Sequence, residues 1–169
     1  MRLQTSLELD IALRIVSMAL AAGRAEKMLP LTVVVLDATG KIITSQSEDG
    51  SGLMRFDIAR GKAWGAPRMG MSNRLIRDRL ATRSSFQVVF ATVADGQFVP
   101  VPGGVLVLRT DRTVIRALGV IGDTSEKDEY SPLLAFKEQN LTVNQKLPTK
   151  IGKAYRYLAS LIKLTKSPS

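Results

Sequence analysis

The stretch PVPGGVLVLRTDRTVIRALGVIGDTSEKDE, residues 100–129, decides the fold of this chain. It holds most of two runs, FVPVPGGVLVLRT and TVIRALGVIGD, that are rich in the valine, isoleucine and leucine favoured in strands. A turn at Asp111-Arg112 separates the two runs, and a Pro-Gly-Gly corner at 102–104 interrupts the first. Acidic residues then lead into a helix predicted over Asp128–Lys137. The stretch therefore predicts two strands followed by a helix.

Segments upstream of this stretch predict a helix, a hairpin and a second helix. The first helix is predicted over about Leu7–Ala22, where apolar residues recur on one face before Gly23. The runs LTVVVL and KIITSQ, joined by a turn at Asp37–Gly40, predict a hairpin. Residues Met54–Pro67 repeat apolar positions every three to four residues, and the proline is expected to end that helix.

The region between the second helix and the corner adds a short helix and a further strand. The helix is predicted to begin at Ser72, with Leu75 among its inward-facing residues. The run FQVVFATV, residues 86–93, predicts a strand that ends at an Asp95-Gly96 turn. With this run there are five strand candidates. The order of elements predicts an α+β fold in which helices cover a mainly antiparallel sheet.

The last part of the chain differs from the rest in charge. Residues 138–169 hold six basic residues and one acid, so they carry +5 of the net charge of +9. After Pro148, apolar residues within Ile151–Ile162 share one face of a predicted amphipathic helix. We therefore expect one domain over residues 1–137 and a basic C-terminal extension over residues 138–169.

Composition excludes several kinds of site. The 169 residues are 45% hydrophobic, which fits one domain with its own core. There is no cysteine and no histidine, so disulfides, thiolate zinc sites, imidazole ligands and histidine-assisted nucleophiles are excluded. Glu8, Asp10 and Arg14 interrupt the first apolar stretch, so it does not resemble a secretory signal and a cytoplasmic location is expected.

The positive charge raises nucleic acid or a membrane as partners, but its distribution favours neither. Outside the extension the net charge is only +4, which is +9 less +5. Five arginines lie near the short helix with no aromatic residue between them, at positions 68, 74, 77, 79 and 83. Binding of RNA or DNA usually adds aromatic stacking to such charge. We therefore expect neither nucleic acid nor a membrane as a partner. A small-molecule ligand is expected instead.

Three stretches together resemble the GlcG/HbpS-like family of heme-binding-related proteins: VVVLDATGKII, FDIARGKAWGAP and residues 100–129. The resemblance covers about Leu7–Lys137. It implies a profilin-like α-β-α sandwich on a five-stranded antiparallel sheet, often assembled into homo-oligomers. Members of the family are described as binding heme or related tetrapyrroles, or they accompany glycolate and diol catabolism. The resemblance thus implies a ligand more firmly than a reaction.

The side chains that could bind heme iron in this sequence make heme a weaker candidate for the cofactor. Heme iron is usually held by histidine, cysteine, methionine or tyrosine, and only the last two occur here. Candidates near the segments that resemble the family are Met54, Met69, Met71 and Tyr130. A methionine at helical spacing is more often a core residue than a ligand. The cofactor therefore stays open.

Two groups of residues could bind a ligand or hold a base. Gly103 and Gly104, beside Pro102, could bring backbone N–H groups to an anionic ligand, or could simply form a tight corner. Lys62 lies on a helix of small residues and could act as a base or as an amine nucleophile, or its stem could pack while its amine pairs with an acid. If Lys62 is a catalytic base, Lys62→Met is expected to lower turnover with little change in the stability of the fold.

The start of the second helix adds Arg55, which could clamp a carboxylate, beside Phe56 and Asp57. Acids cluster after the strand that ends at Gly122, namely Asp123, Glu126, Asp128 and Glu129. Such acids most often cap a surface helix, but crowding can raise one pKa and make a general base. Glu129 is the acid we would assign to catalysis, and Asp128 to ligand binding.

Three classes of function remain open from the sequence. A binding protein would hold a tetrapyrrole or a small organic acid through Arg55, Lys62 and the glycine amides. A cofactor-free isomerase, cyclase or lyase would use Glu129 or Lys62 as base and the glycine amides to stabilise an oxyanion. A structural protein would only assemble into oligomers.

Overall fold

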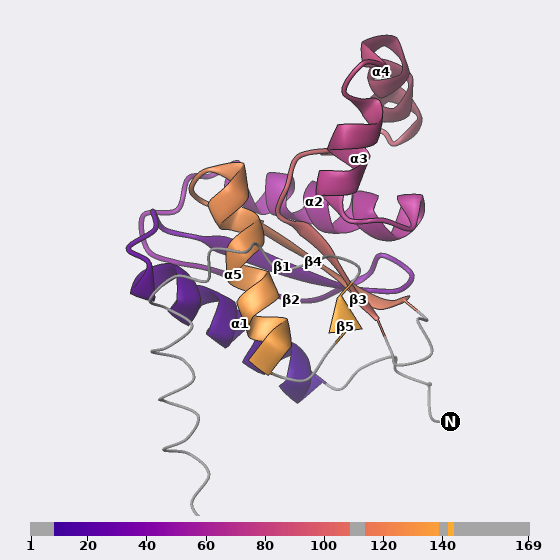
Figure 1. Ribbon diagram of the computed structural model, residues 1–169. Coiled ribbons are helices and arrows are strands. Elements are labelled where there is room, and N and C mark those ends of the chain that lie inside the picture. The colour runs from indigo at the N-terminus through magenta and orange to yellow at the C-terminus, as the bar shows by residue number, and fades with distance from the viewer. Residues whose placement is uncertain (1–8, 109–113, 139–141, 144–169) are drawn as a thin grey trace, which may run out of the picture.

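The computed structural model describes residues 9–108, 114–138 and 142–143 (Figure 1). The helices and strands follow in this order: α1 Leu9–Ala25, β1 Thr32–Asp37, β2 Ile42–Ser47, α2 Arg55–Met69, α3 Asn73–Leu80, α4 Ser84–Val93, β3 Gly104–Leu108, β4 Val114–Ile121, α5 Ser125–Glu138 and β5 Thr142–Val143. The strands form an antiparallel sheet in the order β2-β1-β4-β3, with the two-residue β5 beside β3. The predicted α+β class is confirmed.

Helices cover both faces of the sheet. α1 and α5 lie against one face and against each other, while α2 crosses the other face (Figure 1). Strand β1 is buried on both sides because its residues alternate between two cores: Val33 and Val35 face α1 and α5, and Val34 and Leu36 face α2. This explains why the run LTVVVL is apolar at every position, whereas the edge strand β2 is half exposed. The cores hold α2 and α5 in fixed places beside β4.

Several predicted elements are confirmed and three details are wrong. One is that α1 continues through Gly23 to Ala25 instead of ending before that glycine. The hairpin, β4 and a helix that begins after Ser72 are as predicted, β3 takes up only Gly104–Leu108 of its predicted run, and α5 begins three residues before Asp128. Pro67 does not end α2, which continues to Met69 and loses the one backbone hydrogen bond that a proline cannot donate. Gly70, at φ +63°, ends the helix instead. In α3, Leu75 is exposed rather than turned inward.

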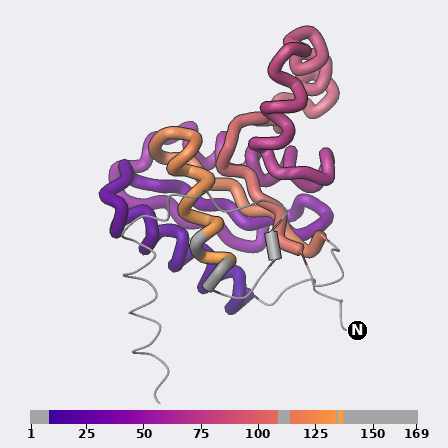
Figure 2. The backbone as a smooth tube through the Cα atoms, in the orientation of Figure 1, coloured from indigo at the N-terminus to yellow at the C-terminus, as the bar shows by residue number. Residues whose placement is uncertain are grey.

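The run FQVVFATV is helix α4, not a strand, so this strand candidate is wrong, and the fifth strand of the described sheet is the short β5 instead. Strand propensity mostly measures how well a residue fits a half-buried pleated surface, and this segment has no sheet edge beside it. Its backbone groups bond to each other within the helix instead. The segment ends at Asp95 and Gly96, both at positive φ, so the predicted turn is present. α3 and α4 extend away from the sheet at one end (Figure 2).

The predicted turn at Asp111-Arg112 and the predicted helix within Ile151–Ile162 lie outside the described residues. So does most of the extension over residues 138–169, of which the structure describes only Glu138 and β5. The division into a domain and an extension therefore stays a prediction.

Candidate functional site

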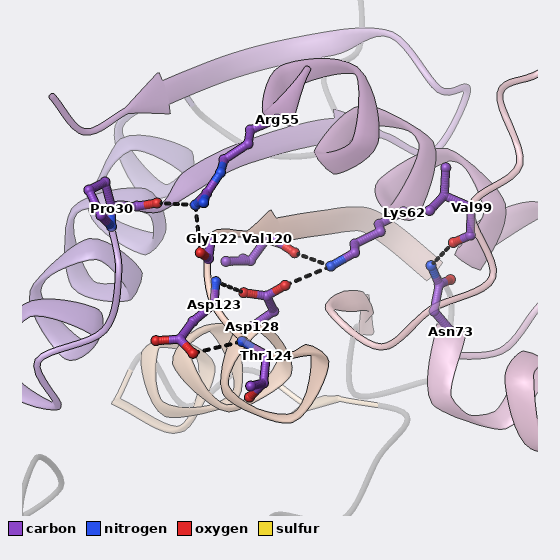
Figure 3. A network of polar contacts seen from close by, with 10 residues as sticks. All are labelled: Pro30, Arg55, Lys62, Asn73, Val99, Val120, Gly122, Asp123, Thr124 and Asp128. Carbon is purple, nitrogen blue, oxygen red and sulfur yellow. Dashed lines mark hydrogen bonds and ion pairs between the residues drawn. The ribbon is translucent and has the colours of Figure 1, made fainter. Parts of the chain in front are cut away.

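A buried ion pair joins α2 to the first turn of α5. The Lys62 Nζ atom lies 2.8 Å from Asp128 Oδ2 and donates a second hydrogen bond, of 2.9 Å, to the Val120 carbonyl oxygen (Figure 3). Both side chains are almost completely buried. The second Asp128 oxygen, Oδ1, accepts the Asp123 amide at 2.9 Å. The pair therefore connects α2, the end of β4 and the start of α5.

The two members of this pair are shifted in opposite directions. Burial lowers the pKa of Lys62, and the charge and hydrogen bond of Asp128 work against that decrease. Burial raises the pKa of Asp128, and Lys62 works against that increase. The Lys62 side chain in this ion pair is an ammonium group that donates to two acceptors, and an ammonium group has no lone pair with which to take a proton from a substrate. The geometry fits the alternative in which this lysine pairs with an acid.

The Pro-Gly-Gly corner packs directly against this pair. Gly103 has φ +113°, and a Cβ atom there would lie 2.5 Å from the Val120 carbonyl oxygen and 2.9 Å from Lys62 Nζ. The positive φ is what the tight-corner alternative required. A Cβ atom at Gly104 would meet the Lys62 carbonyl oxygen and would lie 2.5 Å from the side-chain amide of Asn73. The missing side chains thus let the corner touch α2 and α3.

A second ion pair joins α3 to α5. The Arg74 guanidinium contacts Glu129 Oε2 through two nitrogens, each at 2.5 Å. The Glu129 side chain is buried, and its other oxygen, Oε1, has no hydrogen-bond partner among the described residues. Ser72 Oγ and Asn73 Oδ1, at the start of α3, are buried and unpartnered in the same way. We define the polar cluster as these two ion pairs and these two residues: Lys62, Ser72, Asn73, Arg74, Asp128 and Glu129.

The structure brings together most of the residues that the sequence singled out. Lys62, Gly103, Gly104, Asp128 and Glu129 meet where α2, the corner and α5 converge, and Pro102 is buried beside them. Their roles toward a ligand stay predictions.

Three other candidates at the start of α2 have different surroundings. Arg55 Nη1 donates to the carbonyl oxygens of Pro30 and Gly122, at 2.6 Å each, so its guanidinium already joins two loops (Figure 3). Phe56 packs against the α2 core, and Asp57 is exposed.

The candidate heme ligands do not form a site for iron. Met54 is 73% exposed on the surface, and Met69 and Met71 pack against a small apolar cluster around Ile76. Tyr130 is half-buried and already has an interaction partner. In the described part of the chain, no three histidine, cysteine, aspartate or glutamate residues are placed to hold a metal ion. Met69 and Met71 are therefore core residues rather than candidates for axial ligation of heme.

The sequence analysis missed Ser72, Asn73 and Arg116. Ser72 and Asn73 gave no signal beyond a helix start, but Arg116 is a charge inside the apolar run VIRALGV. Its side chain is fully buried, and none of its three guanidinium nitrogens has a hydrogen-bond partner among the described residues. Burial lowers its pKa to about 10, although the charge of Asp37 on the neighbouring strand opposes this.

Arg116→Met is expected to raise the free energy of unfolding by about 1–3 kcal/mol, because a buried polar group without partners costs about that much. Urea denaturation of the two proteins measures the difference. Arg116→Lys, which keeps a charge, is the control and should not be more stable than the wild type. A less stable Arg116→Met variant would mean that the guanidinium has a partner in solution.

The fold and the polar cluster define a class: an α+β sandwich with buried charges where two helices meet a glycine corner. The profile of the family described as "Haem degrading protein HbpS-like" matches residues 7–131. The chain belongs to the HbpS-like family, which confirms the resemblance seen in the sequence.

Solved structures show the same fold. The crystal structure of a PduOC:heme complex is 21% identical, with a TM-score of 0.74 over 82% of this chain and 99% of that one. The crystal structure of HbpS is 21% identical, with a TM-score of 0.68 over 82% and 93%. Protein ORFY of Klebsiella pneumoniae is 23% identical, with a TM-score of 0.68 over 81% and 92%. The sequence matches no curated protein. Among the described helices, none is long and apolar enough to cross a membrane.

Proposed function

We propose that this protein binds a small organic molecule at the polar cluster and that the ligand is a small hydroxylated organic acid. The observation that carries the proposal is the set of three buried, unpartnered atoms Ser72 Oγ, Asn73 Oδ1 and Glu129 Oε1. An unsatisfied buried polar atom costs about 1–3 kcal/mol, so a ligand that pairs with these atoms gains affinity. Two of the three atoms can only accept hydrogen bonds, so the ligand must offer hydroxyl or N–H groups.

The start of α3 supports the proposal that the ligand carries an acid group. Ser72 occupies the N-cap position, yet its side chain does not bond to the backbone of the helix. The first N–H groups of a helix attract an anionic oxygen when no side chain occupies them. A hydroxy acid would place its carboxylate at this end of α3 and its hydroxyl toward Glu129 or Asn73.

Heme is the other ligand class that the family suggests, since one similar structure is a heme complex. It is less well supported here, because the chain lacks histidine and cysteine and, among the described candidates, Met69 and Met71 pack in an apolar cluster. A tetrapyrrole would have to bind through its carboxylates and ring rather than through its metal.

A thermal-shift series with glycolate, lactate, malate and hemin tests the proposal. A ligand that binds only the folded state stabilises it, by about 2.7 kcal/mol at a hundredfold excess over its dissociation constant. We expect at least one hydroxy acid to raise the melting temperature of the wild type and not of Glu129→Gln. Glu126→Gln is the matched control, because it makes the same change on an exposed residue of the same helix. An equal shift in Glu129→Gln would contradict binding at this cluster.

The second candidate function is proton transfer with Glu129 as the base. The buried, unpartnered Oε1 atom favours this residue over Lys62, whose ammonium is held by two acceptors. The same samples distinguish the two functions, because proton transfer in D2O places deuterium on the carbon next to a carboxylate or carbonyl group. Deuterium uptake by the wild type but not by Glu129→Gln would show an enzyme, and a thermal shift without uptake would show a binding protein.

A further inference from the structure

Arg116 is a buried charge that has no opposite charge paired with it. In the described part of the chain, the buried charged side chains are Lys62, Asp128, Glu129 and Arg116. The first three form ion pairs. The guanidinium nitrogens Nε, Nη1 and Nη2 of Arg116 have no hydrogen-bond partner among the described residues. Burial lowers the pKa of Arg116 only to about 10, so its side chain is still positively charged at neutral pH.

Arg116 lies near the start of β4, on the sheet face that α1 and α5 cover. Its neighbour on β3 is Val107, which belongs to the core beneath those two helices. Leu118 and Val120, two and four residues further along β4, belong to the same core, as the alternation of a strand requires. At about 3.3 Å per residue, Arg116 is about 13 Å along the strand from Val120, the residue that Lys62 of the polar cluster contacts. Arg116 is therefore separate from the ligand site proposed above.

The acid on the neighbouring strand does not pair with Arg116. Asp37 on β1 is in register with Arg116, and its charge acts to raise the pKa of the guanidinium. The carboxylate of Asp37 is held by the turn that follows β1. Its Oδ1 atom accepts hydrogen bonds from the amides of Thr39 and Lys41, at 2.9 Å each, and from the Thr39 hydroxyl at 2.6 Å. Asp37 thus stabilises the turn and accepts no hydrogen bond from Arg116.

A buried guanidinium without a counter-charge is unfavourable, because burial removes the water that would solvate it, and a bound ion is one physical remedy. The N–H groups of arginine form a planar fork that matches two oxygens of an oxyanion. A single negative charge neutralises Arg116, whereas a second would stay buried without a partner. Because the side chain is fully buried, the ion must also be small. We propose that Arg116 binds a planar oxyanion with one negative charge, of the size of formate or nitrate.

Thermal melts of the full-length chain in sodium formate and in sodium nitrate test this proposal. The anion reaches a buried group through local opening of the fold, so each sample is incubated with the salt before the melt. Both salts should raise the melting temperature of the wild type by several degrees more than that of Arg116→Met, in which only the general effect of salt remains. Arg79→Met is the matched control, because it removes an exposed arginine and should respond as the wild type does. Glu129→Gln should also keep the response, since the polar cluster is a different site.

Asp37→Asn distinguishes a bound anion from a partner within the chain. The asparagine oxygen can still accept the hydrogen bonds of the turn, and the loss of a negative charge beside the site should lower the dissociation constant of formate several-fold. A less stable Asp37→Asn variant without this gain in affinity would overturn the proposal, because Asp37 would then be the partner of Arg116. So would an equal response of the wild type and Arg116→Met to both salts. An Arg116→Met variant that is less stable than the wild type without added anion would do the same, since a carboxylate of the chain itself would then hold the guanidinium.

Discussion

Lys62→Met is expected to lower the free energy of unfolding by about 3–5 kcal/mol, because it leaves the Asp128 carboxylate buried without its cation. Lys62 is also a donor to the Val120 carbonyl oxygen, which would lose its partner. This expectation replaces the one drawn from the sequence, in which the lysine was a base and its loss changed stability little. Guanidinium denaturation of the wild type and the variant measures the difference.

Two further variants show whether the pair itself is responsible. Lys127→Met removes a half-exposed lysine that pairs with Asp123, so it should change the free energy of unfolding by no more than about 0.5 kcal/mol. Lys62→Met combined with Asp128→Leu removes both charges and should recover much of the loss. A single variant at Lys62 that is within about 1 kcal/mol of the wild type would show that the pair is not buried in solution.

Local signals in the sequence were sufficient for most of the fold. The hairpin, β3 and β4 have β-branched runs, and α5 follows an acidic start, so residue type and spacing identify them. The run FQVVFATV failed because valine and phenylalanine fit a sheet surface only where a sheet is present. Its actual surroundings, a projection with no strand beside it, depend on the whole fold and leave no trace in eight residues.

The sequence indicated which residues of the candidate site lie close together, but not how they contact each other. Gly103, Gly104 and the acidic helix start lie within the stretch that decided the fold, and the helix with Lys62 packs against β4. The pairing of Lys62 with Asp128, however, joins residues 66 positions apart, and no local pattern reports it. Arg55 looked free to bind a carboxylate because backbone carbonyl oxygens from distant loops are invisible in a sequence. Ser72 and Asn73 were missed because only their burial makes them unusual.

Gly104→Ala is expected to destabilise the fold by about 1–3 kcal/mol, the usual cost of forcing an extra carbon into a packed site. The new Cβ atom would meet the Lys62 carbonyl oxygen on the backbone of α2, which cannot move alone. It would also lie 2.5 Å from the amide of Asn73, which is held by a 2.8 Å hydrogen bond to the Val99 carbonyl oxygen (Figure 3). A shift of Asn73 would move one acceptor of the polar cluster.

The melting temperature of Gly104→Ala is measured without ligand and with each hydroxy acid of the thermal-shift series. The first value reports the stability of the fold, and the shift reports binding. Gly52→Ala is the control, because a Cβ atom there would have its nearest neighbour, Arg55 Nε, at an ordinary 3.7 Å. If the corner acts through packing, Gly104→Ala should lose stability and binding together. A variant as stable as the wild type that no longer binds would instead mean that the corner itself touches the ligand, as the glycine amides first suggested.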